Sequence, residues 1–153
     1  MIEGFSNTQC EIDLIGSGSN EQKLRDLSDE HTTKVNFLGT YSNNQLLELY
    51  KNYKYYVSTS NFEGNSKTIL ESLSSGCIVY AKDISNNREI ITHEVNGFLY
   101  SGKFDYKEFQ MVKNLPTSTL EKVSESAINL IESSYSIGTI ANLEYKNYIN
   151  LMK

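Results

Sequence analysis

Short apolar runs alternate along this chain with stretches in which apolar residues recur every three or four positions. The runs predict β-strands over residues 11–15, 35–38, 55–58, 78–81 and 97–100. The stretches between them predict helices over residues 20–30, 43–53, 67–75 and 86–92. Strands that alternate with helices are typical of a parallel sheet, because each parallel connection needs a crossover that covers one face of the sheet. The sequence therefore predicts an α/β fold with a parallel sheet and flanking helices.

After Ser101 the pattern contains only helices. Pro116 breaks it, and either Thr117 or Ser118 is placed to cap a helix over residues 119–133. A last helix is expected over residues 138–151. Because the chain has no internal repeat and no low-complexity linker, we expect residues 1–153 to form a single domain. Residues 118–153 would be its C-terminal helical segment.

The composition excludes several classes of protein. The net charge is −5, and no basic run is longer than two residues, which argues against nucleic-acid binding. No apolar stretch approaches the roughly 18 residues that a membrane-spanning helix needs, and no secretory signal pattern opens the chain. Cys10 and Cys77 are interpreted as buried free thiols rather than as a disulfide. These features predict a cytoplasmic protein with at most peripheral contact at the inner face of the membrane.

The strongest candidate chemistry lies between residues 58 and 71. A strand ends there, a turn with a glycine follows, and Ser66 is placed to cap the next helix. Glu63 lies in the loop and Glu71 on the helix, at the edge of the sheet where α/β proteins bind ligands. The helix N-terminus suits a phosphate, and the carboxylates suit hydroxyl groups. A nucleotide sugar offers both.

Each of these residues also has an ordinary interpretation. Glu63 is equally a common loop carboxylate, and Glu71 a solvated helix residue. Residues 16–18, Gly-Ser-Gly, are only half of a dinucleotide-binding fingerprint and by themselves indicate a tight turn. Lys67 is near enough to the helix start to reach a phosphate, although a surface lysine has the same pattern.

An ordered set of motifs points to a family. The chain resembles the C-terminal, nucleotide-sugar-binding half of GT-B retaining glycosyltransferases of the family-4 type, the glycosyl transferases of group 1. The runs that carry the resemblance are residues 14–18, 35–39, 46–50, 57–60, 63–71, 76, 88–91, 96–99, 135–136 and 145–148. They cover nearly the whole chain. The resemblance implies a Rossmann-like domain.

The resemblance also implies roles for individual residues. Glu63 would contact hydroxyls of the donor sugar and help to place the anomeric carbon, as the catalytic residue. Glu71 would accept hydrogen bonds from the ribose hydroxyls. The remaining donor-binding residues are backbone contributors: Gly64, Asn65 and Ser66 beside the sugar and phosphates, and Gly16, Gly18, Phe37, Leu38, Gly39 and Thr40 beside the base. The family needs neither a metal nor another cofactor, and no Asp-x-Asp pair is present.

Two departures from the family pattern shape the expectation. An acceptor-binding domain has no counterpart in the chain, and neither does the strand that normally opens the donor domain with an Arg and a Lys. Lys23 and Arg25 lie on another helix and do not replace those cations. The strand concerned is central in the usual order 3-2-1-4-5-6. We therefore expect residues 11–15 and 55–60 either to pair directly or to leave a gap.

The predicted function is the donor-binding half of a glycosyltransferase that acts in polysaccharide or lipid-linked glycan assembly. Such a half would show little or no turnover alone, as a truncated product, a fragment, or a chain whose acceptor domain is encoded separately. The alternative is a non-catalytic module that binds a nucleotide or a protein partner. A plain α/β domain with a coincidental match is a third interpretation.

Overall fold

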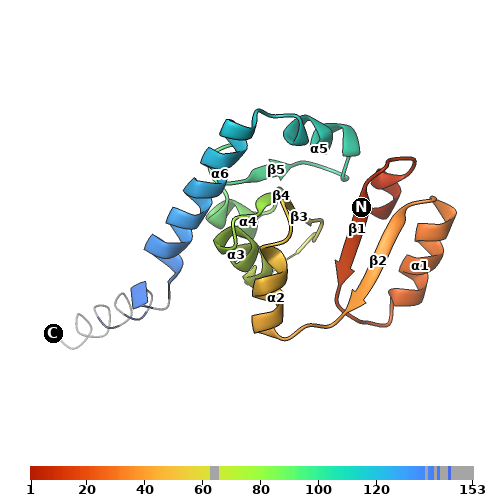
Figure 1. Cartoon of the computed structure of the whole chain (residues 1–153), viewed down its shortest axis with the longest axis horizontal. Coiled ribbons are helices and arrows are strands. Elements are labelled where there is room, and N and C mark those ends of the chain that lie inside the picture. The colour runs from red at the N-terminus through yellow and green to blue at the C-terminus, as the bar shows by residue number, and fades with distance from the viewer. Residues whose placement is uncertain (63–65, 137, 140, 142–144, 146–153) are drawn as a thin grey trace.

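The computed structural model describes residues 1–62, 66–136, 138, 139, 141 and 145. Parallel strands alternate with helices along most of this length, and helices alone follow the last strand (Figure 1). The elements are η1 (Ile2–Phe5), β1 (Glu11–Ile15), α1 (Glu21–Glu30), β2 (Lys34–Gly39), α2 (Asn43–Tyr50), β3 (Tyr55–Ser58), α3 (Lys67–Ser74), β4 (Ile78–Lys82), α4 (Ser85–Ile90), β5 (Phe98–Tyr100), α5 (Tyr106–Lys113), α6 (Thr117–Leu130) and η2 (Ile131–Tyr135). The predicted α/β class is confirmed.

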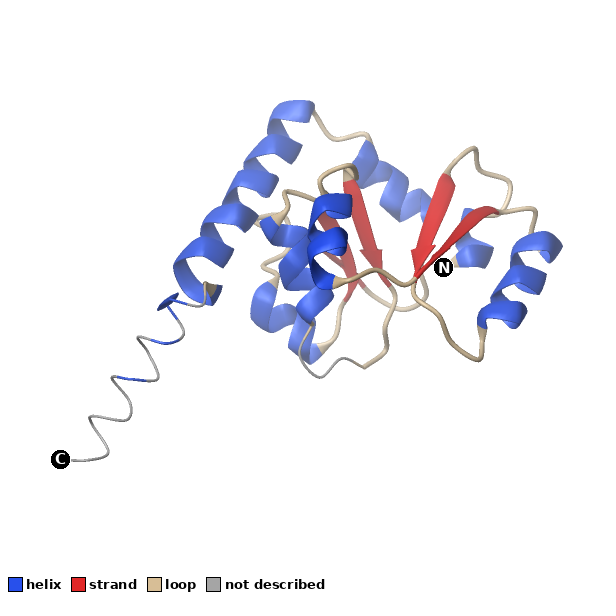
Figure 2. Cartoon of the chain, turned by 60° about the horizontal axis from the view of Figure 1, so that its bottom comes forward, coloured by secondary structure: helices blue, strands red, loops and turns tan. Residues whose placement is uncertain are grey.

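The strands form two parallel sheets rather than one. In the first, β1 pairs with β2, and Glu11 lies opposite Lys34. In the second, β4 lies between β3 and β5. The strands of both sheets run in the same direction, with β1 and β3 on the facing edges (Figure 2). Of the two expected arrangements, the structure therefore has the gap: β1 and β3 do not pair, and the residues before Cys10 form the 3₁₀-helix η1 instead of a strand.

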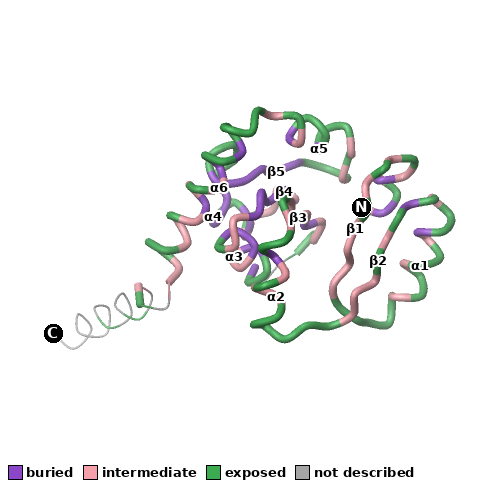
Figure 3. The backbone as a smooth tube through the Cα atoms, in the orientation of Figure 1, coloured by how far each residue is buried: buried purple, intermediate pink, exposed green. Residues whose placement is uncertain are grey.

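The larger sheet holds most of the core. Residues 78–81 of β4 are all buried. Val79 and Ala81 cluster with α3 on one side, Ile78 and Tyr80 cluster with α5 on the other, and α6 contributes to both clusters. Figure 3 shows this concentration of buried backbone around β4, whereas β1 and β2 are mostly of intermediate exposure. The buried Phe5 of η1 stacks on Phe104 with ring centroids 4.9 Å apart. The N-terminal turn thereby joins the two sheets.

Some helix boundaries differ from those predicted. The helix expected over residues 43–53 ends at Tyr50, because the chain tightens there: the amides of Asn52 and Tyr53 bond to carbonyls only three residues back. The helix after Pro116 begins at Thr117 itself. Neither Thr117 nor Ser118 therefore caps it, and Pro116 occupies the cap position without a side-chain hydrogen bond. Most of the helix predicted over residues 138–151 lies outside the described residues.

Two further observations concern membrane-spanning helices and metal sites. No helix among the described residues is long and apolar enough to cross a membrane. Over the same residues, no group of three or more His, Cys, Asp or Glu side chains is placed to hold a metal ion.

Candidate functional site

The predicted ligand-binding loop follows β3 at its carboxyl end. Glu63, Gly64 and Asn65, to which the sequence assigns sugar and phosphate contacts, lie outside the described residues. The structure places the two ends of the loop. Ser58 is buried at the end of β3, and Ser66 is buried at the start of α3. The expected strand-to-loop-to-helix order is therefore present.

Ser66 occupies the N-cap position of α3, as predicted, but its hydroxyl does not cap the helix. The hydroxyl instead donates to Oδ1 of Asn87, at 3.1 Å. Asn87 is fully buried on α4, and its amide Nδ2 donates to the carbonyl of Lys82 at 2.8 Å. The predicted side-chain cap is wrong, since the hydroxyl lies toward the buried Asn87 and accepts no hydrogen bond from the first amides of α3. The network fixes the start of α3 against the next strand-to-helix turn.

Asn87 was not predicted as part of the site. Asparagine is a poor helix former, and here it stands in a six-residue helix that begins three residues after the end of β4. The adjacent Asn86 is only half-buried, and nothing in the sequence distinguishes it from the buried Asn87. The identity of its partner, Ser66, depends on the tertiary structure and is not readable from the sequence.

Glu71 lies in the second turn of α3 with its side chain only 11% exposed. Its Oε1 has no hydrogen-bond partner among the described residues. The Nζ of Lys67 is 3.4 Å from this oxygen, within ion-pair range but without the geometry of a hydrogen bond. Glu71 is thus not the solvated helix residue of the ordinary interpretation. A buried carboxylate oxygen with free lone pairs is an acceptor available to a ligand hydroxyl.

The residues expected beside the base meet at the carboxyl ends of β1 and β2. The amide of Gly16 donates to the carbonyl of Gly39 at 2.7 Å. Gly39 has a φ of +70°, a conformation that favours glycine, and Gly16 has a φ of +129°. The guanidinium carbon of Arg25 lies over the Phe37 ring, 4.1 Å from the ring centroid. The remaining predicted members are close in the chain: Gly18 and Thr40 are exposed, and Leu38 is half-buried.

One contact links these residues to the start of α3. Helix α2 begins at Asn43, three residues after Thr40, and Oδ1 of Asn43 accepts a hydrogen bond from Lys67 Nζ at 2.7 Å. Lys67 therefore contacts α2 and also pairs with Glu71. A second cation borders the loop: Lys82 donates to Asn61 Oδ1 at 2.5 Å. Arg88 pairs with Asp83 instead, and this hydrogen bond holds the pKa of the Asp83 carboxyl below its usual value.

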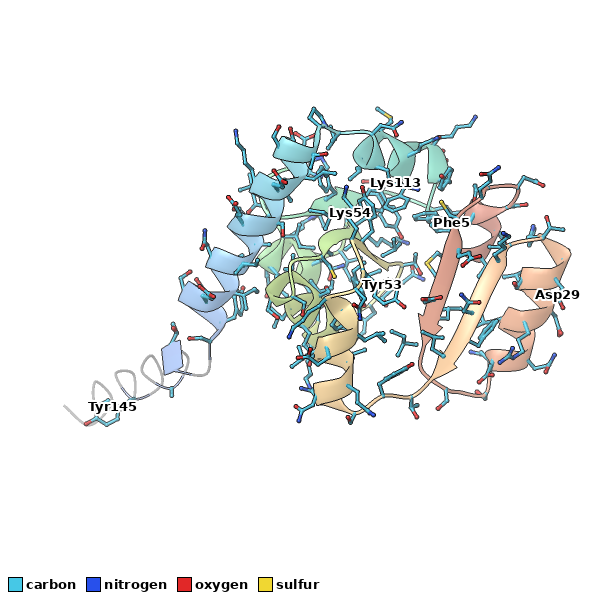
Figure 4. The ribbon with its side chains drawn as sticks, in the orientation of Figure 1. Phe5, Asp29, Tyr53, Lys54, Lys113 and Tyr145 are labelled. Atoms are coloured by element: carbon cyan, nitrogen blue, oxygen red, sulfur yellow. The ribbon has the colours of Figure 1, made fainter. Side chains whose placement is uncertain are left out.

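A cavity of about 480 Å³ separates the two sheets. Its walls are β1 with Cys10, β3 with the turn before it, and parts of η1, α2, α3 and α5. Figure 4 shows Phe5, Tyr53, Lys54 and Lys113 around this space. Tyr53 bridges it by donating a hydrogen bond to Asp13 of β1. Burial, together with this bond to Asp13, raises the pKa of Tyr53 to about 12.

This arrangement is that of a Rossmann-like α/β domain, with a buried carboxylate beside a helix start at the carboxyl edge of a parallel sheet. The family model described as "Glycosyl transferases group 1" matches residues 2–111. Since the match spans well over half of the chain, the chain belongs to this family.

Curated relatives agree with the family match. The chain is 30% identical over 128 residues to the poly(glycerol-phosphate) alpha-glucosyltransferase of Bacillus subtilis (strain 168), covering 81% of this chain and 19% of the relative. It is 30% identical over 89 residues to the GtfA subunit of the UDP-N-acetylglucosamine–peptide N-acetylglucosaminyltransferase of Streptococcus agalactiae, covering 58% and 17%. The chain thus spans about a fifth of the length of these relatives.

Solved glycosyltransferase structures share the fold. Anabaena HepE in complex with UDP-glucose superimposes with a TM-score of 0.85 at 19% identity, covering 97% of this chain and 44% of that one. TarM gives a TM-score of 0.78 at 21% identity, with 98% and 30% covered. The predicted resemblance to the C-terminal half of GT-B glycosyltransferases is therefore confirmed at the level of fold and family.

Proposed function

We propose that this chain is the donor-binding part of a glycosyltransferase that transfers a hexosyl group from a nucleotide-diphosphate sugar to a hydroxyl of a glycan or lipid-linked acceptor. The observation that carries the proposal is the buried Oε1 of Glu71, an acceptor without a hydrogen-bond partner among the described residues. A ribose hydroxyl would supply the missing donor. Transfer would proceed with retention of configuration. The Bacillus subtilis relative is named an alpha-glucosyltransferase, and an α-linked product formed from an α-linked donor means retention.

The other predicted residues complete the proposed donor site. Glu63 would bind hydroxyls of the donor sugar, while the backbone of Gly64, Asn65 and Ser66 would face the sugar and phosphates. The loops of residues 16–18 and 37–40, joined through Gly16 and Gly39, would border the base. Lys67 and Lys82 flank the loop and would offset charge on the diphosphate without a metal ion. A uridine nucleotide is the favoured donor, since HepE was solved with UDP-glucose and the GtfA relatives are named for a UDP-sugar.

Calorimetric titration of the purified chain with UDP-, GDP- and ADP-sugars tests this site. We expect saturable binding of one nucleotide class, weakened at least about tenfold in Glu71→Ala, because losing a hydrogen bond to a charged group costs about 1.5–3 kcal/mol. The matched control is Glu48→Ala, which removes an exposed glutamate from the neighbouring helix α2 and should bind like the wild type. Equal binding by Glu71→Ala and the wild type would contradict the assignment.

We further propose that a separate chain with the acceptor-binding domain is needed for turnover. Two observations support it. Among the described residues, β1 and β3 do not pair with each other and face a cavity that an extended strand from a partner would fill, and the GtfA relatives are named as subunits. The site of action would be the cytoplasm, in peripheral contact with the membrane when the acceptor is lipid-linked. The alternative, a non-catalytic nucleotide- or partner-binding module, is favoured by the same open cavity.

Radiolabelled sugar transfer separates the two functions. We expect the purified chain alone to show no transfer above the no-enzyme background with any glycan or lipid acceptor. Adding a chain that carries an acceptor domain and an extended strand that fits between β1 and β3 should produce transfer that Glu71→Ala reduces. Turnover by the chain alone would contradict the need for a partner, whereas nucleotide binding that never leads to transfer with such a partner would favour the non-catalytic module.

A further inference from the structure

Three titratable side chains meet beside the cavity, away from the proposed donor site. Cys10 immediately precedes β1, while Tyr106 and Lys113 are the first and last residues of α5. The Sγ of Cys10 is 3.2 Å from Lys113 Nζ and 3.3 Å from the Tyr106 hydroxyl. Tyr106 and Lys113 are seven residues apart, two helical turns, so both side chains extend from one face of α5. Residues that are 96 and 103 positions apart from Cys10 in the sequence thus form one cluster with it.

The cluster has the features of an activated thiol. The Lys113 ammonium donates a hydrogen bond to the sulfur, and the Tyr106 hydroxyl is within hydrogen-bond distance of it, with either atom able to be the donor. Once Cys10 is ionised, its sulfur accepts from both groups, which stabilises the thiolate, the form that reacts as a nucleophile. Burial by itself would raise the pKa of Cys10, but the hydrogen bonds from Tyr106 and Lys113 and the charge of Lys113 together hold it below its usual value. The sulfur is also accessible, since Cys10 is only partly buried and lines the cavity together with Lys113.

The carboxylates on the cavity wall are paired with residues other than Lys113, so they leave its ammonium beside the Cys10 thiol. These carboxylates are Glu11 and Asp13. Glu11 forms an ion pair with Lys34 at 3.8 Å. Asp13 accepts hydrogen bonds from Asn36, at 2.7 Å, and from Tyr53. Neither carboxylate competes with Cys10 for the ammonium.

Cys77 has the opposite environment within the same chain. It is 1% exposed, and its thiol donates to the carbonyls of Tyr50 and Tyr53, each at 3.4 Å. Burial raises the pKa of Cys77 to about 11. The fold therefore encloses the Cys77 thiol in its protonated form, whereas the Cys10 thiol lies beside a cation and is open to small molecules.

We propose that Cys10 is a nucleophilic thiolate and the site at which low-molecular-weight disulfides modify this chain. In the reaction, the Cys10 thiolate attacks one sulfur of the disulfide, a new S–S bond forms, and the original S–S bond breaks. The second half of the reagent leaves as a thiolate. Cys10 is oxidised and the leaving half is reduced, so the exchange needs no other oxidant. This inference is independent of the proposed donor site.

Mass spectrometry of the intact folded chain tests the proposal, with iodoacetamide and oxidised glutathione as probes. We expect Cys10 to react at neutral pH and Cys77 to stay unmodified until urea unfolds the protein. The pH–rate profile of Cys10 should have its midpoint below that of free glutathione measured in parallel. The glutathione adduct should be released by dithiothreitol. A Cys10 profile that coincides with that of the free thiol, or reaction at Cys77 first, would overturn the proposal.

Variants on α5 separate activation from simple exposure. Lys113→Met keeps the apolar part of the side chain and removes the ammonium, so Cys10 should react several-fold more slowly at pH 7 with its midpoint moved upward. Tyr106→Phe should shift the profile in the same direction. The matched control is Lys107→Met, an exposed lysine of the same helix, which should react like the wild type. Unchanged rates in folded Lys113→Met would show that exposure alone governs Cys10 and would refute the thiolate assignment.

Discussion

Replacing Leu73 with alanine is expected to lower the free energy of unfolding by about 3 kcal/mol, within the range of about 2–5 kcal/mol for leucine truncation in a core. Leu73 is completely buried on α3. It packs in a cluster with Val79 and Ala81 of β4 and Ala127 of α6. The truncation would leave a void at the place where the helix meets the sheet.

Urea unfolding followed by circular dichroism measures this effect, and Met111→Ala is the control. Met111 is 72% exposed on α5, so its truncation should change the free energy of unfolding by no more than about 0.5 kcal/mol. A loss below about 1 kcal/mol for Leu73→Ala would mean that α3 is not held by this cluster in solution. The outcome matters for the proposed donor site, because α3 carries Glu71 and its position depends on this packing.

The sequence predicted the order of strands and helices well because a parallel sheet imposes it. Each strand of β3, β4 and β5 is a short apolar run, and each crossover returns over a face of the sheet, so the pattern and the topology follow from one constraint. At β1 and β3 the comparison of motifs left two arrangements open, direct pairing or a gap, and the structure has the gap. Helix ends were predicted less well, as at Tyr50, because local turns and proline geometry decide them within a residue or two.

The residues of the candidate site were likewise predictable from the sequence only in part. Glu71 was predicted from its place after a turn, and the structure adds a buried oxygen, Oε1, that lies beside the Lys67 ammonium but has no hydrogen-bond partner among the described residues. The contacts that hold the site were not predictable, because they join residues from different crossovers: Lys67 to Asn43, and Ser66 to Asn87. Sequence motifs mark residues that contact a ligand, whereas the residues that position them are selected by packing and carry no fixed spacing.

Removing the Asn87 side chain should show that this support is energetically important. We expect Asn87→Ala to lower the free energy of unfolding by about 2 kcal/mol, because it leaves the buried Ser66 hydroxyl without its partner, at a cost of about 1–3 kcal/mol. It also removes one of two hydrogen bonds to the Lys82 carbonyl, which keeps the bond from the Ile84 amide. Urea unfolding provides the measurement. Ser66→Ala removes only one member of the network and should cost less.

The double variant Ser66→Ala/Asn87→Ala separates the network from generic loss of packing. If the two side chains act through their mutual hydrogen bond, the double variant should be more stable than the sum of the single effects predicts, by about 1 kcal/mol. Strict additivity would show that the two residues stabilise the fold independently.

Titration of the folded Asn87→Ala protein with the nucleotide sugar then decides the functional role. Weakened binding is expected, since Ser66 begins the helix that carries Glu71, whereas folded Leu73→Ala, with the Ser66–Asn87 contact intact, should retain more of its affinity. Equal affinities in the two variants would mean that the network stabilises the fold without positioning the donor site.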